Sequence, residues 1–228
     1  MEMTHLAKTF WEITALIAAQ TIVSMILFAA AITVLVLFLR PRVRKYKPSD
    51  MAVFDRLSGI TTARNNRFML FITALGNHKI LIPANLAVII YFLFTGKQTW
   101  FSIKVGVIAL SSLGLMFLLK YLFKRKRPLA PLLAAVRGLS FPSGHAIMSL
   151  TFYGLLAYIS WHTIDIGWMR YLAIFMLVGL VLLIGFSRVY LRVHYASDVL
   201  AGFIIGAVWL FISLSVLGKI EEEVSRII

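Results

Sequence analysis

The charge-free stretches of this chain constrain its fold more than any other feature. Six stretches of 15 to 27 residues contain no Asp, Glu, Lys or Arg, and they cover residues 13–39, 80–96, 105–119, 138–164, 171–187 and 199–218. A helix of about 20 apolar residues crosses the hydrocarbon core of a bilayer. The chain is 61% hydrophobic and 14% charged, whereas a typical soluble domain has about 25% charged residues. An ordinary soluble protein is therefore excluded.

We expect an all-α integral membrane protein that forms a single domain over residues 1–228. Its six transmembrane helices are predicted at about 13–39, 79–96, 100–120, 143–163, 169–187 and 197–218. The third span extends past Lys104 because a lysine near a helix end can snorkel to the interface. The first apolar run is longer than the h-region of a signal peptide, and no A-x-A-like site follows it, so we expect it to be retained.

The longest break between spans is residues 40–79. It begins with a basic, proline-bounded run at 40–48, and apolar residues then alternate with polar ones over 51–75. Such a pattern predicts one or two amphipathic helices that lie at the membrane interface. We therefore expect an interfacial amphipathic segment between helices one and two.

The charge balance and the acidic residues narrow the class of partner and site. The net charge is +14, which in a membrane protein points to anionic lipid head groups or a phosphorylated substrate rather than nucleic acid. The absence of Cys excludes thiolate nucleophiles and Cys-based metal sites. No carboxylate occurs between Asp55 and Asp165, and the membrane face expected to be catalytic has one Asp to offer. Because two-metal phosphatases use several carboxylates and histidines, we predict no metal and no cofactor.

Polar residues gather in three places, at 120–128, 141–145 and 187–198. With six spans, the loops after spans one, three and five lie on one face of the membrane, so the three clusters meet. That face would present three cations that can donate hydrogen bonds to a phosphate, two histidines and one carboxylate. They are Lys120, Arg127, Arg188, His145, His194 and Asp198. Such a set suits an oxyanion site with acid–base groups. The neighbouring Lys124, Arg125 and Lys126 are interpreted as interfacial anchors.

The second cluster has the pattern of a helix start. Ser143 is a good N-cap, the free N–H groups of the first turn can face an anion, and Gly144 allows close approach of the backbone. A histidine at position 145 can donate a proton to a departing oxygen. The alternative is an ordinary capped helix start with an interfacial histidine.

His194 and Asp198 stand four residues apart and would share a helix face. Asp198 can hold one imidazole nitrogen as a donor, which leaves the other nitrogen available as a nucleophile. The alternative is a structural His–Asp pair that caps the sixth span.

Taken together, these three clusters resemble the signature of the type 2 phosphatidic acid phosphatase superfamily. The matching patterns are Lys120-x6-Arg127-Pro128, Pro142-Ser143-Gly144-His145 and Ser187-Arg188-x5-His194-x3-Asp198. The resemblance implies that His194 is the nucleophile and forms a phosphohistidine, that Asp198 orients it, and that His145 protonates the leaving oxygen and then activates water. It also implies a set of groups that bind the phosphoryl oxygens without a metal: Lys120, Arg127, Ser143, Gly144 and Arg188.

Integral-membrane members of that family act on lipid phosphates, so the resemblance implies metal-independent hydrolysis of a phosphate monoester or diphosphate on a membrane lipid. The expected substrate is phosphatidic acid, phosphatidylglycerol phosphate, polyprenyl diphosphate or lipid A. Two alternatives stay open, a lipid phosphotransferase on the same fold and a non-enzymatic anion or lipid transporter. The oligomeric state is open as well.

The orientation in the membrane is predicted in two conflicting ways. The resemblance implies a bacterial inner-membrane protein with its active site facing the periplasm or exterior. Most Lys and Arg residues outside the spans lie on the catalytic face, and the positive-inside rule would place that face in the cytoplasm. Our prediction follows the resemblance.

Overall fold

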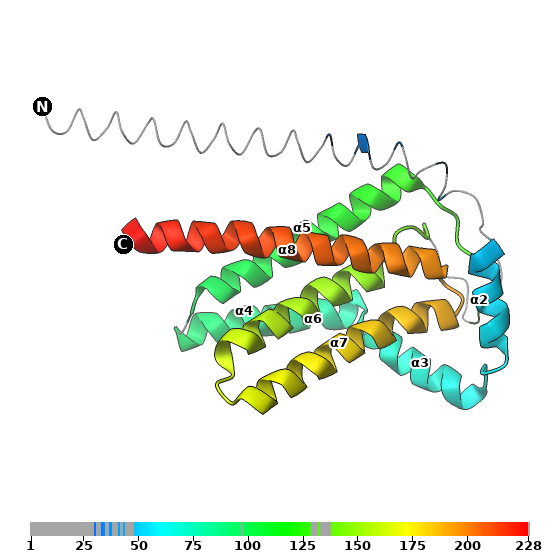
Figure 1. Ribbon diagram of the computed structural model, residues 1–228, viewed down its shortest axis with the longest axis horizontal. Helices are drawn as coiled ribbons and strands as arrows, with labels where there is room; N and C mark the ends of the chain where they lie inside the picture. The colour runs from blue at the N-terminus through cyan, green and yellow to red at the C-terminus, as the bar shows by residue number, and fades with distance from the viewer. Residues whose placement is uncertain are drawn as a thin grey trace, which may run out of the picture. The chain divides into compact units, whose positions relative to one another are not determined.

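The computed structural model describes residues 30, 33, 34, 37, 41, 43, 48–96, 98–128, 132 and 138–227. The chain divides into two compact units, Met1–Lys45 and Tyr46–Ile228. The described residues of the second unit form seven helices and no strand: α2 Pro48–Ser58, α3 Ala63–Leu75, α4 His78–Thr95, α5 Trp100–Phe123, α6 Gly144–Thr163, α7 Gly167–Tyr190 and α8 Ala196–Ile227 (Figure 1). The predicted all-α class is confirmed for this part of the chain.

Among the described residues, four helices are long and apolar enough to cross a membrane. They are α4, α5, α7 and the segment Ala196–Arg226 of α8. These helices cover the predicted spans 79–96, 100–120, 169–187 and 197–218 almost completely, and α8 continues well past the predicted end. The predicted first span, 13–39, lies almost entirely outside the described residues.

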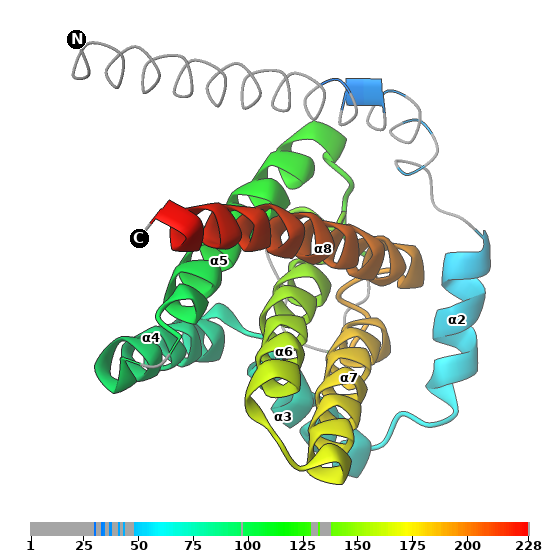
Figure 2. The same cartoon turned by 60° about the vertical axis from the view of Figure 1, so that its left-hand side comes forward.

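Helix α6 occupies the predicted span 143–163 but is not among those four helices. It carries polar residues along its length, including Ser149 and Thr151, both buried. It contacts α4, α5, α7 and α8; it lies between α7 and α8 in Figure 1, and in Figure 2 it runs beside α7 and below α8. A helix that faces protein on most sides does not need a lipid-like surface, which explains its lower hydropathy. The count of six spans stays a prediction.

Local sequence explains several helix ends. Thr62 accepts a hydrogen bond from the backbone N–H of Asn65 at 3.2 Å and caps α3, and Asn77 does the same for α4 through the N–H of Lys79 at 3.1 Å. Such caps satisfy backbone donors that a helix start leaves free. Gly96 ends α4 with a φ of 62°, a left-handed conformation that glycine adopts at little cost.

The predicted amphipathic segment 51–75 forms two helices, α2 and α3. Phe54 of α2 is buried in an apolar cluster with Ala146 of α6, with Tyr195, which directly precedes α8, and with Val199 of α8. Figure 2 shows α2 beside the first turns of α8. Helix α2 is therefore packed against the helices of the bundle through its largest apolar residue.

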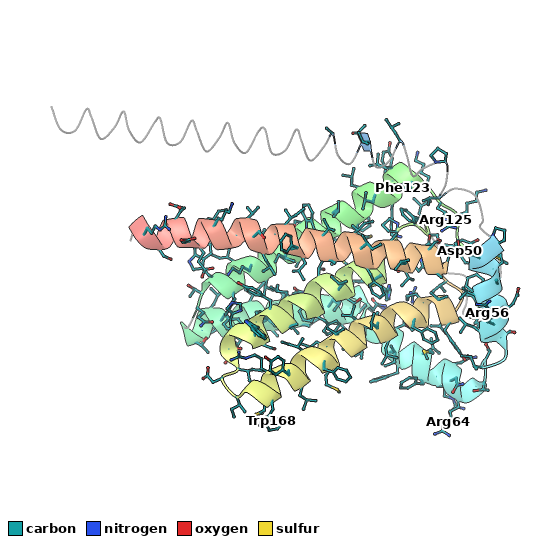
Figure 3. All side chains as sticks on the ribbon, viewed as in Figure 1. Asp50, Arg56, Arg64, Phe123, Arg125 and Trp168 are labelled. Atoms are coloured by element: carbon teal, nitrogen blue, oxygen red, sulfur yellow. The ribbon has the colours of Figure 1, made fainter. Side chains whose placement is uncertain are left out.

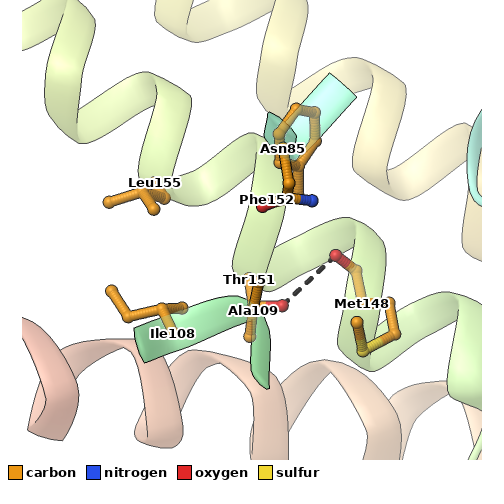
Figure 4. Close-up of a pocket in the computed structure, with 7 residues that line it drawn as sticks. All are labelled: Asn85, Ile108, Ala109, Met148, Thr151, Phe152 and Leu155. Atoms are coloured by element: carbon orange, nitrogen blue, oxygen red, sulfur yellow. Dashed lines mark hydrogen bonds between the residues drawn. The ribbon is translucent and has the colours of Figure 1, made fainter. Parts of the chain in front are cut away.

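Two of the pockets in the described part of the chain lie along the bundle. A small cavity of about 10 Å³ lies between α4, α5 and α6 and is lined by Asn85, Ile108, Ala109, Met148, Thr151, Phe152 and Leu155 (Figure 4). An apolar groove of about 190 Å³ is lined by residues of α6, α7 and α8. Neither pocket contains a charged residue.

Close contact between α6 and α8 depends on a glycine. A Cβ atom at Gly202 would lie 2.8 Å from the Cβ of Ala146 and 3.0 Å from the carbonyl oxygen of Ser143, whereas a Cβ at Gly218 of the same helix would meet nothing within 4 Å. Real Cβ atoms do not approach other atoms this closely, so α8 and the start of α6 must shift apart to admit one.

We expect Gly202→Ala to lower stability by about 1–3 kcal/mol, the usual cost of overpacking. Gly218→Ala should leave stability unchanged or raise it by about 0.5 kcal/mol, because alanine favours a helix interior. Thermal unfolding of the two purified variants in the same detergent measures the difference. A Gly202→Ala protein that melts at or above the wild-type temperature would contradict the expected clash.

Candidate active site

The three polar clusters of the sequence lie at one end of the bundle. The end of α5, the start of α6, the end of α7 and the start of α8 meet there, with α2 and α3 alongside (Figures 1 and 2). The structure thus brings together all eight residues that the sequence singled out. The connections α4–α5 and α6–α7 lie at the opposite end of the bundle.

His194 lies between a carboxylate and a guanidinium. Its side chain is almost completely buried, its Nδ1 is 3.6 Å from Oδ2 of Asp198, and its Nε2 is 3.3 Å from Nη1 of Arg127. The Nδ1 atom makes no hydrogen bond within the described structure. The two ring nitrogens therefore face opposite partners, and Nε2 is the one directed toward the cationic side of the site.

Burial lowers the pKa of His194 to about 3; the nearby carboxylate of Asp198 opposes this shift, and the positive charges of Arg127 and Arg188 add to it. The imidazole is consequently neutral at physiological pH, which leaves a lone pair on one ring nitrogen. Burial also lowers the pKa of the Arg127 guanidinium, while Asp198 acts in the opposite direction.

The three cations predicted to bind phosphate differ in their hydrogen-bond partners. Lys120 donates from Nζ to the carbonyl of Leu139 at 2.8 Å, and Arg127 donates to the carbonyls of Gly138 at 3.2 Å and Val193 at 2.9 Å. Arg188 is buried, and its Nε atom has no hydrogen-bond partner within the described structure. Because a buried donor without a partner is costly, Arg188 is suited to receive an anionic oxygen.

The start of α6 completes the cationic side. Ser143 is fully buried and caps the helix, with its hydroxyl accepting from the N–H of Ala146 at 3.4 Å. A Cβ at Gly144 would lie 3.8 Å from Cε of Lys120, so the first turn of α6 passes directly beside that lysine. His145 lies within electrostatic range of His194, Arg188 and Arg127. Free N–H groups at a helix start favour an anion at this place.

Asp198 is fully buried and held from several sides. Its Oδ2 accepts hydrogen bonds from the hydroxyl of Ser140 and from the backbone N–H of Tyr195 at 2.9 Å, and its Oδ1 accepts from Nη1 of Arg125 at 2.6 Å. Its backbone carbonyl also accepts from the N–H of Ser143 at 3.1 Å, which ties α8 to the start of α6. The carboxylate is therefore fixed in position relative to both helices.

The interpretation of Arg125 as an interfacial anchor is wrong. Its side chain is 2% exposed and bridges two carboxylates, Asp198 and Asp50, the latter at 2.9 Å from its Nη2. Figure 3 labels Arg125 and Asp50 at the same end of the bundle. Lys124 and Lys126, expected to be anchors as well, are exposed. The basic run gives no sign of this difference, because the positions of its side chains depend on the turn that ends α5 at Lys124, whose φ is 48°.

The expectation of one carboxylate at this end of the molecule is wrong too, because Asp50 of α2 is buried there with Asp198. Thr73 of α3 is a further residue that sequence reasoning missed. Its hydroxyl oxygen accepts a hydrogen bond from Nη1 of Arg188 at 2.7 Å and holds that guanidinium in place. Within the part of the chain that the structure describes, no three His, Cys, Asp or Glu side chains are grouped as metal ligands.

The chain is similar to proteins of a known family. The family model of the PAP2 superfamily matches residues 101–222. Phosphatidylglycerophosphatase B of Bacillus subtilis (strain 168) is 30% identical over 148 residues, which are 64% of this chain and 72% of that protein. A putative undecaprenyl-diphosphatase of Escherichia coli (strain K12), YbjG, is 30% identical over 128 residues, 54% of this chain and 60% of that protein.

Two solved structures share the fold. The transmembrane PAP2 type phosphatidylglycerolphosphate phosphatase from Bacillus subtilis gives a TM-score of 0.73 at 27% identity, covering 84% of this chain and 96% of that one. Aquifex aeolicus LpxE gives 0.62 at 22% identity, covering 76% and 98%. The family match spans more than half of the chain and contains every one of the eight singled-out residues. This integral membrane protein is therefore a lipid phosphatase that belongs to the PAP2 superfamily.

Proposed function

We propose that this protein hydrolyses a phosphate monoester or diphosphate on a membrane lipid through a phosphohistidine on His194, without a metal ion. The observation that carries the proposal is the position of the His194 ring, with Nδ1 toward Asp198 at 3.6 Å and Nε2 toward Arg127 at 3.3 Å. A neutral imidazole with its proton on Nδ1 has its lone pair on Nε2, which accepts from Nη1 of Arg127 here and can attack phosphorus once the phosphoryl oxygens take over that donor.

The first step transfers the phosphoryl group to the enzyme. Nε2 of His194 attacks phosphorus while the bond to the ester oxygen breaks, and the electron pair leaves with that oxygen. The oxygen takes a proton from His145, whose imidazole is charged once an anionic phosphate lies beside it. Asp198 balances the positive charge that develops on the His194 ring. The three cations, the Ser143 hydroxyl and the Gly144 N–H stabilise the equatorial oxygens, where phosphoryl transfer concentrates charge.

The second step returns the enzyme to its starting state. Neutral His145 takes a proton from a water molecule whose oxygen forms the new bond to phosphorus. The phosphorus–nitrogen bond breaks, its electron pair returns to Nε2, and inorganic phosphate leaves. Every charge change is met by a group already present at this end of the bundle, so the chemistry requires no metal-bound hydroxide.

Phosphatidylglycerol phosphate and undecaprenyl diphosphate are the first substrates to test, because the named activities of two relatives concern them. Phosphatidic acid and lipid A complete the set. We expect the purified protein in detergent with excess EDTA to release phosphate from at least one of these lipids, at a rate unchanged by the chelator. Release that EDTA abolishes and added Mg²⁺ restores would contradict the metal-independent mechanism, and release that requires an added lipid acceptor would indicate a phosphotransferase.

We also infer one domain with six spans, namely residues 13–39 and helices α4 to α8, and a catalytic end that faces the periplasm or exterior of a bacterial inner membrane. The chain contains no Cys, so single cysteines report on topology without background. Lys126→Cys, exposed at the catalytic end, should react with an impermeant thiol reagent in intact cells, and Lys219→Cys near the other end of α8 should react only after lysis. The reverse pattern would place the active site in the cytoplasm, as the charge count predicts.

A further inference from the structure

We propose that Asp50 and Arg125 are positioning residues that keep the Asp198 carboxylate directed toward the ring of His194. Helix α2 is then a functional part of the active site. The inference rests on the proposed function of His194 and Asp198. Asp50, Arg125 and Asp198 come from α2, from the segment after α5 and from α8, respectively. Figure 3 shows Asp50 and Arg125 near each other at the end of the bundle where α2 lies.

The contacts form a continuous buried chain. Arg125 donates from Nη1 to Oδ1 of Asp198 at 2.6 Å and from Nη2 to Oδ2 of Asp50 at 2.9 Å, and all three side chains are at most 4% exposed. The hydroxyl of Ser197 accepts from Arg125 at 2.8 Å and donates to Asp50 at 2.8 Å. The guanidinium also lies over the ring of Tyr195, 4.2 Å from its centroid. Arginine can make this bridge because its planar fork carries several donors in fixed directions.

The bridge supplies one of the three side-chain hydrogen bonds that fix the direction of the Asp198 carboxylate. The final torsion of an aspartate is broad and roughly two-fold, so bonds to both oxygens hold it more firmly than bonds to one. Arg125 holds Oδ1, and Oδ2 is then directed toward His194 and the N–H of Tyr195. Without Arg125, the hydroxyl of Ser140 and the Tyr195 N–H both bind the same oxygen, and nothing in the described structure fixes the other.

Asp50 contributes charge and position. A lone Arg125 beside Asp198 would neutralise the carboxylate that has to balance the developing charge on His194. The second carboxylate offsets the guanidinium, so the triad of Asp50, Arg125 and Asp198 keeps a net charge of about −1. Asp50 also accepts from the backbone N–H of Ser197 at 3.1 Å, in the first turn of α8, and so fixes the helix that carries Asp198.

The experiment compares Arg125→Lys, Asp50→Asn and the double variant with two matched controls. The controls are Asp55→Asn and Lys126→Gln. Asp55 lies on the same helix as Asp50, Lys126 follows Arg125 in the chain, and both side chains are exposed. We expect kcat to fall roughly 10- to 100-fold in Arg125→Lys and about 10-fold in Asp50→Asn, the usual range for residues that orient a catalytic group. KM should change little, because neither residue is placed against the phosphate, and the controls should match the wild type.

Two features separate positioning from a general loss of stability. The double variant should be no slower than Arg125→Lys alone, because both changes interrupt one chain of contacts. Ser197→Ala, which removes no charge, should lower kcat by a few-fold and serves if Arg125→Lys does not fold. A rise in KM at unchanged kcat, or independent additive losses, would overturn the inference.

A readout that needs no substrate keeps this inference distinct from the proposed function. Nitrogen NMR of protein labelled with ¹⁵N-histidine, assigned through a His194→Gln sample, reports which ring nitrogen of His194 carries the proton. We expect Nδ1 to be protonated in the wild type and a mixture of tautomers in Arg125→Lys and Asp50→Asn. If the wild type releases no phosphate but the tautomer responds, the proposed function fails and the positioning role stands. If phosphate is released and neither kcat nor the tautomer changes in the variants, the positioning role fails alone.

Discussion

Replacement of His194 by alanine should abolish phosphate release and leave the fold intact. The ring is the group that forms the covalent intermediate, and removing a nucleophile costs on the order of 10⁴-fold or more in kcat. The side chain is buried, and its Nδ1 makes no hydrogen bond in the described structure. Removal of the ring therefore breaks no hydrogen bond to Asp198. The measurement is phosphate release from the preferred lipid in detergent, together with thermal unfolding.

Trapping the intermediate makes this test specific. Wild-type protein mixed briefly with ³²P-labelled lipid and quenched in base should carry label that is stable to alkali and lost in acid, as expected for a phosphoramidate, and His194→Ala should carry none. His162→Ala is the matched control, since His162 is an exposed histidine at the far end of α6 whose ring nitrogen lies 2.8 Å from the carbonyl of Tyr158. Label that persists in His194→Ala would assign the nucleophile to another residue.

Replacement of His145 by alanine should have a large effect that depends on the leaving group. General acid–base catalysis contributes roughly 10²- to 10⁴-fold, and we expect a loss in that range with a lipid phosphate, whose alcohol is a poor leaving group. An aryl phosphate with an acidic phenol needs little proton donation, so its first step should be affected much less. The position of His145 beside the turn after α3, where a Cβ at Gly76 would lie 3.2 Å from its Cδ2, limits the ring to one region of the site.

The second role of His145 gives this prediction its sharpest test. Because water activation is lost along with proton donation, the phosphoenzyme should accumulate when His145→Ala reacts with the aryl phosphate. Rapid-quench measurement of labelled enzyme and of released phenol should show a burst of about one phenol per enzyme, followed by slow turnover. An equal loss on both classes of substrate, without a burst, would remove His145 from the acid–base role and leave it as a structural residue.

Periodic and local features of the sequence were sufficient for the helical class and for most helix limits. The charge-free runs predict α4, α5, α7 and α8, because an apolar run of that length is best buried in the bilayer and a helix satisfies its backbone hydrogen bonds there. His194 and Asp198 could also be named in advance from their motif spacing, but the predicted shared helix face is wrong, because α8 begins at Ala196 and His194 lies in the turn before it. Helix α6 shows that hydropathy alone does not identify every helix of the bundle. Its neighbours are other helices, so it can carry polar residues that a lipid-facing helix would not.

The tertiary structure decided what spacing could not. Arg125 looks like Lys124 and Lys126 in the chain, and Asp50 and Thr73 look like ordinary residues of a surface segment. Their roles arise only when α2 and α3 pack against the bundle, because a buried guanidinium needs carboxylates from elements far apart in sequence. The sequence by itself determined which groups we propose for phosphoryl transfer, since that proposal depends on residue type and local spacing. The residues that hold these groups in place were decided only by the tertiary structure, because their contacts come from long-range packing.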